Sequence, residues 1–250
     1  MKLLLMTLAA VTAFAQEKSL ACDGGNRNDS VCEMREQTVA YGGRLTVDGG
    51  VNGGVSIKGW DNSSVLVRSR VEGRGVDLAQ IQVNWAGGQV KASGPEMKGQ
   101  ANWSVSYEVF VPRSADLSLK TVNGGISIAN VRGNIDFHAV NGGVNLKNLA
   151  GDVEGKTQNG GLNVTLAGTR WDGAKLDART VNGGVNVSMP QNYSAHFETA
   201  TVNGHVNANF DMTVHGNISE ANKKLSTDIG AGGPTVHVET TNGGVNVKRI

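Results

Sequence analysis

The sequence contains few of the residues on which several classes of protein depend. Two of its 250 residues are cysteine, four are proline and 5% are aromatic, whereas 35 are glycine. Two cysteines are too few for a disulfide-dense scaffold or for a four-cysteine zinc site. The glycines follow no Gly-X-Y period, which excludes a collagen-like chain.

Neither sign of charge dominates the chain. It has 23 Lys and Arg against 22 Asp and Glu, a formal net charge of +1. This balance excludes a nucleic-acid groove built on bulk positive charge, and also a charge-driven disordered tail. No stretch after the N-terminal segment approaches 18 apolar residues, so we expect no membrane span in the mature chain. The 39% of hydrophobic residues is enough for a core.

The N-terminus is typical of an exported protein. Lys2 precedes the apolar run 3–11, and Ala13-Phe14-Ala15 matches a cleavage site. We therefore predict that residues 1–15 are a signal peptide and that the mature protein is periplasmic, at the cell surface or secreted.

Export permits a disulfide bond between Cys22 and Cys32. We predict that this bond closes residues 16–40 into a cysteine-bridged N-terminal segment. The alternative is lipid attachment at Cys22, because residues 20–22 resemble a lipobox, but Glu17 and Lys18 interrupt the apolar run before it.

An internal Asn-Gly-Gly repeat dominates the sequence. Copies begin at Asn52, Asn123, Asn141, Asn159, Asn182 and Asn242, and a degenerate seventh copy is Asn203-Gly204-His205. The copies from 123 to 159 are eighteen residues apart, and corners at Gly133 and Gly151 halve that interval. Asn and Gly tolerate positive φ, so we predict a sharp corner of low strain at each copy.

The segments between corners alternate apolar and polar residues, as in Val144-Asn145-Leu146, which is typical of short strands with one buried face. Such strands become stable when stacked copies share one core. We predict an all-β fold in which residues 116–250 form a β-solenoid, parallel β-helix-like, with 18-residue coils. Asn-Gly is also a hairpin signal, so an antiparallel meander or sandwich is the alternative. Lys248 and Arg249 on the last strand are expected to blunt an open sheet edge.

Residues 41–115 have longer alternating runs, such as 105–111. These predict an antiparallel, sandwich-like β subdomain that caps the solenoid.

The order of several motifs resembles a family of exported bacterial β-strand-repeat domains of unknown function, generally labelled adhesins. The matching pieces are Cys22 and Cys32-Glu33, Gly42-Gly43-Arg44-Leu45-Thr46-Val47, Val109–Pro112, the Thr-Val-Asn-Gly-Gly copies, Trp171-Asp172-Gly173, and Ile229–Pro234 before Thr241–Gly244. The resemblance implies an exported, all-β, solenoid-like protein with no established enzymatic activity.

One set of polar residues recurs at the same place in the repeats. Each follows a Val or Leu after the corner; the set is Asn145, Asn163, Asn186, Asn207 and Asn246. In stacked coils they form a column with Ser127. The column is either a hydrogen-bonded ladder that fixes register or a polar face for a glycan or partner. The four tryptophans have two possible roles: their rings stack against sugars or, more simply, they pack under loops. They are Trp60, Trp85, Trp103 and Trp171.

We predict no catalytic residue, no metal site and no cofactor. The histidines show no metal-binding spacing, and the repeats carry Asn where a calcium-binding repeat carries Asp. The expected function is a non-catalytic, adhesin-like protein with a rigid polar β surface that binds a glycan, an envelope component or another protein. The alternatives are a carbohydrate-active β-helix enzyme, for which Asp136, Asp152 and Glu154 are the nearest carboxylates, and a purely structural envelope or stress-response module.

Overall fold

The computed structural model describes residues 20–22, 30–210 and 223–250. The predicted signal peptide, residues 1–15, lies outside these ranges. The described residues form two ten-stranded sheets and one short 3₁₀ turn, η1 (Leu78–Gln80). The all-β prediction is therefore confirmed. Among the described residues, no helix has the length and apolarity needed to cross a bilayer.

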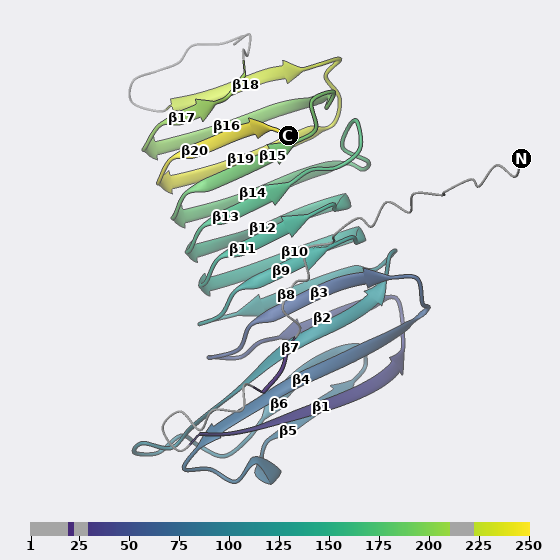
Figure 1. The fold of residues 1–250 in the computed structure, drawn as a ribbon, viewed down its shortest axis with the longest axis vertical. Coiled ribbons are helices and arrows are strands. Elements are labelled where there is room, and N and C mark those ends of the chain that lie inside the picture. The colour runs from purple at the N-terminus through teal and green to yellow at the C-terminus, as the bar shows by residue number, and fades with distance from the viewer. Residues whose placement is uncertain (1–19, 23–29, 211–222) are drawn as a thin grey trace, which may run out of the picture.

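Each sheet draws its strands from the whole length of the chain (Figure 1). Sheet 1 has, in spatial order, β1 (Ser30–Ala40), β4 (Ser64–Arg74), β7 (Asn102–Pro112), β3 (Val55–Trp60), β9 (Ile126–Ala129), β11 (Val144–Lys147), β13 (Leu162–Thr165), β15 (Val185–Met189), β20 (Val245–Arg249) and β17 (Val206–Ala208). Sheet 2 has β18 (Lys223–Ile229), β16 (Ala195–Asn203), β19 (Thr235–Asn242), β14 (Lys175–Asn182), β12 (Ala150–Asn159), β10 (Arg132–Asn141), β8 (Asp116–Thr121), β2 (Arg44–Asp48), β6 (Gln89–Ser93) and β5 (Gln82–Ala86).

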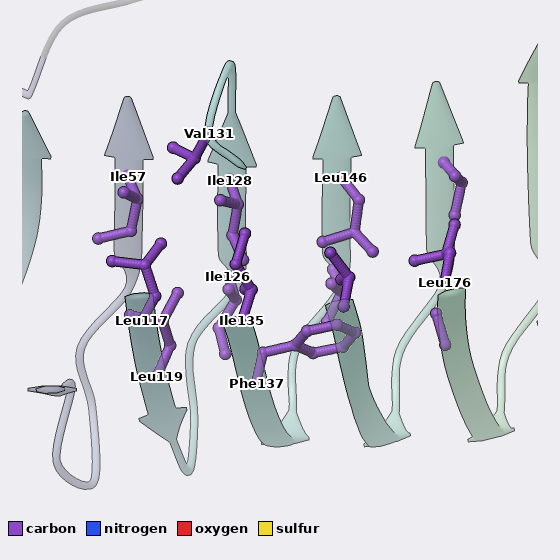
Figure 2. Close-up of a cluster of buried hydrophobic side chains, with 14 of the residues drawn as sticks. Ile57, Leu117, Leu119, Ile126, Ile128, Val131, Ile135, Phe137, Leu146 and Leu176 are labelled. Atoms are coloured by element: carbon purple, nitrogen blue, oxygen red, sulfur yellow. The ribbon is translucent and has the colours of Figure 1, made fainter. Parts of the chain in front are cut away.

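One continuous core lies between the two sheets. The alternating strands direct every second side chain inward. Ile126 and Ile128 from sheet 1 and Ile135 and Phe137 from sheet 2 are almost completely buried (Figure 2). Full burial of such a side chain contributes roughly 1.5–3 kcal/mol, so the core is the main source of stability for strands this short.

The repeat strands pair in parallel. Asn141 lies opposite Asn159 in sheet 2, and Val144 lies opposite Leu162 in sheet 1, so partners here are eighteen residues apart. The alternative of an antiparallel meander is therefore wrong for the repeats. We call the following strand pairs, each joined by an Asn-Gly corner, the repeat stack: β2/β3, β8/β9, β10/β11, β12/β13, β14/β15, β19/β20 and β16/β17.

The repeat strands begin earlier in the chain than the predicted boundary at residue 116. β2 is parallel to β8 and β3 is parallel to β9, so the corner at Asn52 already belongs to the repeat stack. These strands have the same short alternation and the same corner as the later copies. In this N-terminal part, antiparallel pairing joins β1, β4 and β7 in sheet 1 and the β5–β6 hairpin in sheet 2.

The last copies do not stack in chain order. The coil of Asn242, β19/β20, is inserted between the coils of Asn182 and Asn203. The expectation that Lys248 and Arg249 blunt an open edge is therefore wrong, because β20 lies between β15 and β17. The outer strands at this end are β17 and β18, and β18 is antiparallel to β16.

The Asn-Gly-Gly corners do not use positive φ, contrary to the prediction. The residues with positive φ lie at other corners and loops, for example Gly151 at +103° and Asn130 at +60°. The first glycine of each repeat is instead required by a close approach. A Cβ on Gly160 would overlap the carbonyl oxygen of Gly142 in the next coil, whereas a Cβ on Gly161 would lie 3.5 Å from the nearest atom, the oxygen of Gly184. The second position therefore has room for a side chain, which explains His205 in the degenerate copy.

At five of these corners a buried threonine binds one coil to its neighbour, whereas the coil of Asn141 has Ala139 at this position. The Oγ1 of Thr157 donates to the carbonyl oxygen of Gly142 at 2.7 Å, and Thr180 donates to Gly160 at 2.8 Å. Equivalent bonds join Thr121 to Gly53, Thr240 to Gly183 and Thr201 to Gly243. This contact explains the Thr of the Thr-Val-Asn-Gly-Gly motif.

Candidate functional site

The predicted asparagine column lies on the outer face of sheet 1. Asn163 Nδ2 donates to Asn145 Oδ1 at 2.9 Å, and Asn186 donates in turn to Asn163 at 2.9 Å. Asn246 and Asn207 continue the ladder at 3.2 and 3.4 Å, in the order set by the inserted coil. Because the amides already bond to one another, this geometry favours the register role. A binding role for the column stays a prediction.

A second ladder follows the corners. The side-chain amide of each corner asparagine donates to the next, in the order Asn203, Asn242, Asn182, Asn159, Asn141, Asn123, Asn52, with Nδ2 to Oδ1 distances of 2.7–3.1 Å. All donors point toward the N-terminal end of the stack.

Cys22 and Cys32 form a disulfide bond, which supports the predicted bridge over lipid attachment at Cys22. The bond ties the segment 20–22 to β1. Arg70 of β4 also donates to the carbonyl oxygen of Ala21 at 3.5 Å. The bridge therefore has a structural role at one end of sheet 1.

The outer face of sheet 2 carries two rows of charge that the sequence analysis did not find. The acidic row contains Asp136, Glu154 and Asp177 and begins beside Ser118, and the basic row contains Lys120, His138, Lys156 and Arg179. Neighbours within a row lie on strands about 4.8 Å apart. Like charges at such positions destabilise a sheet. The rows are therefore unlike the neutral column on sheet 1.

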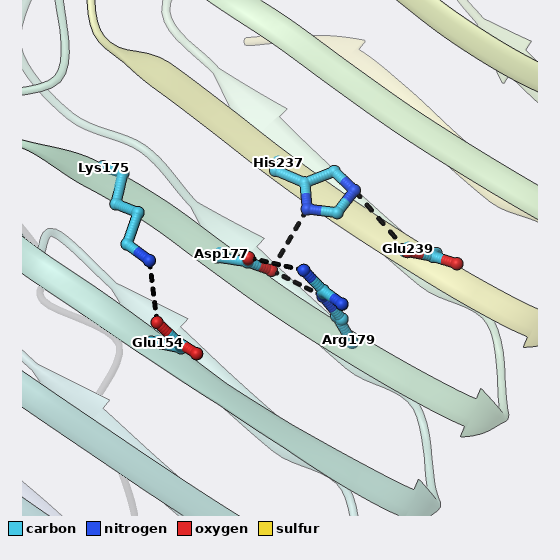
Figure 3. Close-up of polar contacts among 6 residues, drawn as sticks. All are labelled: Glu154, Lys175, Asp177, Arg179, His237 and Glu239. Carbon is cyan, nitrogen blue, oxygen red and sulfur yellow. Dashed lines mark hydrogen bonds and ion pairs between the residues drawn. The ribbon is translucent and has the colours of Figure 1, made fainter.

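The signs reverse at the inserted strand β19. His237 lies opposite Asp177, and Glu239 lies opposite Arg179. Figure 3 shows the result: Arg179 donates two hydrogen bonds to Asp177, at 2.8 and 2.7 Å, and His237 Nδ1 lies 3.1 Å from Asp177 Oδ1. His237 Nε2 lies 3.6 Å from Glu239, and Lys175 donates to Glu154 at 2.7 Å.

These contacts shift the pKa of several groups. Partial burial of Asp177 raises its pKa, but hydrogen bonding from Arg179 and the nearby charges of His237 and Arg179 outweigh burial, and the net pKa is below the ordinary value. Hydrogen bonding to Asp177 raises the pKa of Arg179, and hydrogen bonding to Glu154 raises that of Lys175. Asp177, Arg179 and Lys175 are therefore charged at neutral pH.

A groove of about 600 Å³ lies over this cluster. Its charged lining comes from three adjacent strands and from β18; it includes Lys175, Arg179, Glu198, Lys224, His237 and Glu239. The sequence analysis missed it because β14, β16 and β19 become neighbours only through the inserted coil. The available signal was the inverted order of charge, Asp177-Ala178-Arg179 against His237-Val238-Glu239.

Of the other predicted candidates, two carboxylates are held in ion pairs and one tryptophan is packed inside the fold. Asp136 forms an ion pair with Arg44, and Glu154 pairs with Lys175 as above. Trp171 is 3% exposed and donates to the carbonyl oxygen of Gly151, so it is not a surface platform. Within the described ranges, no group of three His, Cys, Asp or Glu could hold a metal ion.

Residues 38–248 match the Toastrack DUF4097 family. The chain belongs to this family. The match covers most of the chain, and it bears out the resemblance seen in the motif order. No curated protein matches the chain.

Two solved structures are similar to this chain at low sequence identity. A protein of Clostridium sporogenes, provisionally named a cell adhesion protein, is 16% identical with a TM-score of 0.50, over 88% of this chain and 100% of that one. A protein of Bacteroides fragilis, provisionally named an adhesin, is 14% identical with a TM-score of 0.42, over 87% and 97% of the two chains. The first likeness shows that this chain and the Clostridium sporogenes protein share a fold.

Proposed function

We propose that this Toastrack protein is an exported, non-catalytic, adhesin-like scaffold of the cell envelope, and that it binds a glycan through the charged groove on sheet 2. In this proposal the repeat stack is a β-solenoid with 18-residue coils in its regular part. Its stiffness holds the binding groups in place before the ligand arrives, which lowers the entropic cost of binding. The predicted signal peptide and the disulfide of Cys22 and Cys32 support an exported location.

The groove is the observation that carries this proposal. Carboxylates from three adjacent strands line it (Asp177, Glu239 and Glu198), together with the guanidinium group of Arg179, and both kinds of group hydrogen-bond well to the hydroxyl groups of a sugar. Its volume of about 600 Å³ lies within the usual range for small-ligand sites. The carboxylate of Asp177 is paired with Arg179 and His237, and that of Glu239 lies 3.6 Å from His237. Such pairing supports binding rather than acid catalysis, which needs a carboxyl group with a raised pKa.

A purely structural envelope module is the second candidate. It is favoured by the two asparagine ladders, because their amides bond mainly to one another. The first candidate predicts that the groove binds a saccharide. The second predicts that no surface of the protein does.

A glycan array probed with the purified mature protein tests the proposal. We expect binding to a defined set of glycans, and loss of that binding in the double variant Arg179→Gln, Glu239→Gln. The matched control is Asn186→Ser on sheet 1, which should bind as the wild type does. Thermal unfolding of all three proteins shows whether they are folded. If a folded wild type binds no glycan, or if only the sheet 1 variant loses binding, the groove is not the binding site.

A further inference from the structure

A second pocket lies beside the first Asn-Gly-Gly corner, that of Asn52, and shares no lining residue with the charged groove. It has a volume of about 420 Å³ and is lined by residues of β2, β6, β7, β8, β10 and the loops beside them. Its apolar wall includes Ala92, Met97, Trp103 and Val122. Met97 is 44% exposed and Val122 39%, so large apolar side chains face solvent here although a full core is available.

The apolar wall is held in place by its own loop. Trp103 Nε1 donates to the carbonyl oxygen of Pro95 at 2.9 Å. A Cβ on Gly94 would lie 2.8 Å from the Trp103 ring, so the loop packs directly on the indole. The indole is therefore fixed in position, and its contact surface costs little conformational entropy on binding.

The rim of the pocket is positively charged. Lys120 Nζ lies 3.2 Å from Asp48 Oδ2, and Lys91 Nζ lies 3.8 Å from the same oxygen. One carboxylate thus faces two ammonium groups, so these three groups have a net charge of +1. His138 also lines the pocket. Both lysines are more than half exposed, so a ligand can reach them.

The corner asparagine ladder ends in this pocket. Its last member, Asn52, lines the pocket and accepts from Asn123, and its own Nδ2 has no hydrogen-bond acceptor within the described part of the chain. Because all the amides point the same way, each bond polarises the next. The Asn52 N–H group is therefore the donor end of a chain of aligned dipoles, which favours a negatively charged acceptor.

We propose that this pocket binds a single free fatty-acid anion, with the carboxylate at Lys91, Lys120 and Asn52 and the first methylene groups against Trp103 and Met97. Charge complementarity at the rim and the apolar wall select this ligand together. A purely apolar ligand gives the lysines and Asn52 of the rim no acceptor, and a simple anion leaves the apolar wall in contact with water. This site is separate from the groove proposed for glycans, so either proposal can fail alone.

Titration calorimetry of the mature protein with decanoate tests the inference. We expect decanoate to bind at least tenfold more tightly than acetate, which lacks the chain, and decylamine, which has the opposite charge. Met97→Asp should weaken decanoate binding at least tenfold, and Lys91→Glu should weaken decanoate while strengthening decylamine. Arg179→Gln in the distant groove is the matched control and should leave decanoate binding unchanged.

Three outcomes overturn the inference. They are no binding of decanoate by the folded wild type, equal binding of decylamine and decanoate, and decanoate binding that is insensitive to Met97→Asp. Flotation with anionic phospholipid vesicles distinguishes the lipid source: binding to vesicles that depends on Met97 would replace the free fatty acid with a membrane surface.

Discussion

The middle and the C-terminal end of the repeat stack are built from the same corner but are ordered by different interactions. Between β8 and β13 the copies follow chain order, with neutral asparagines on one face and rows of like charge on the other. At the C-terminal end the last coil is inserted between two earlier ones, and the charges of β19 are opposite to those of β14. Backbone geometry thus makes the coils stackable, and we infer that opposite charges favour β19 as the neighbour of β14.

Charge favours β19 over β16 as the neighbour of β14. β19 places His237 opposite Asp177 and Glu239 opposite Arg179. If β16 took that position in the same register, Glu198 would face Asp177 and Ala200 would face Arg179. Like charges directly opposite are unfavourable, so chain order is disfavoured at this step.

Substitution of the first glycine of a corner should have the largest effect on the free energy of unfolding. It tests the close approach between coils, which both regions share. Gly160→Ala forces a Cβ onto the Gly142 carbonyl, and we expect a loss of about 2–4 kcal/mol in the free energy of unfolding. Gly161→Ala is the matched control and should change it by less than about 1 kcal/mol. Urea unfolding followed by circular dichroism measures both. Equal effects would show that close approach is not the reason for the first glycine.

Removal of a corner hydroxyl should have the next largest effect. Thr180→Val leaves the Gly160 carbonyl without its side-chain donor, and we expect a loss of about 1–2 kcal/mol. Thr241→Val in the inserted coil is the control, because Val occupies that place in other copies, and it should be nearly neutral. The same urea titration checks this, and a neutral Thr180→Val would show that the hydroxyl contact does not hold the coils.

Reversing one charge should change the free energy of unfolding in opposite directions in the two regions: it should destabilise the C-terminal end and leave the middle unchanged or more stable. Glu239→Arg places two guanidinium groups opposite each other and should cost about 1 kcal/mol, and adding Arg179→Glu should restore most of it. Lys156→Glu in the middle puts an acid between His138 and Arg179 and should be neutral or stabilising. A double-mutant cycle measures the coupling. A cycle with no coupling would remove charge as the reason for the stacking order.

The smallest effect is a pH dependence confined to the C-terminal end. Hydrogen bonding to Asp228 raises the pKa of His196, helped by Glu198 and opposed by burial. Because the folded pKa is raised, this contribution is present below the ordinary histidine pKa of about 6.5 and is lost as pH rises through the raised value. The side chain is exposed, so we expect only a few tenths of a kcal/mol. His196→Gln should abolish the dependence in unfolding titrations across that range, and Asp228→Asn should reduce it because Glu198 remains beside the imidazole. Persistence of the full dependence in either variant would exclude this pair.

Much of the architecture was predictable because it is local. The interval of eighteen residues, the alternation in Val144-Asn145-Leu146 and the Asn column followed from periodicity alone. The reason for Gly160 did not, because overlap with Gly142 is a contact between coils, whereas positive φ is a property of one residue. The insertion of the last coil was also missed, since the corners at Asn203 and Asn242 are nearly identical in sequence and only the charges of distant strands distinguish them. The charged groove depends on that insertion and was missed with it.

Disulfide cross-linking across sheet 1 tests the stacking order most directly. Asn186 lies opposite Asn246 on the adjacent strand, and Asn207 is one strand further away. Adjacent strands about 4.8 Å apart permit a disulfide, and twice that distance does not. We expect Asn186→Cys with Asn246→Cys to form an intramolecular bond, detected by peptide mapping, and Asn186→Cys with Asn207→Cys to form none. The opposite result would show that the coils stack in chain order.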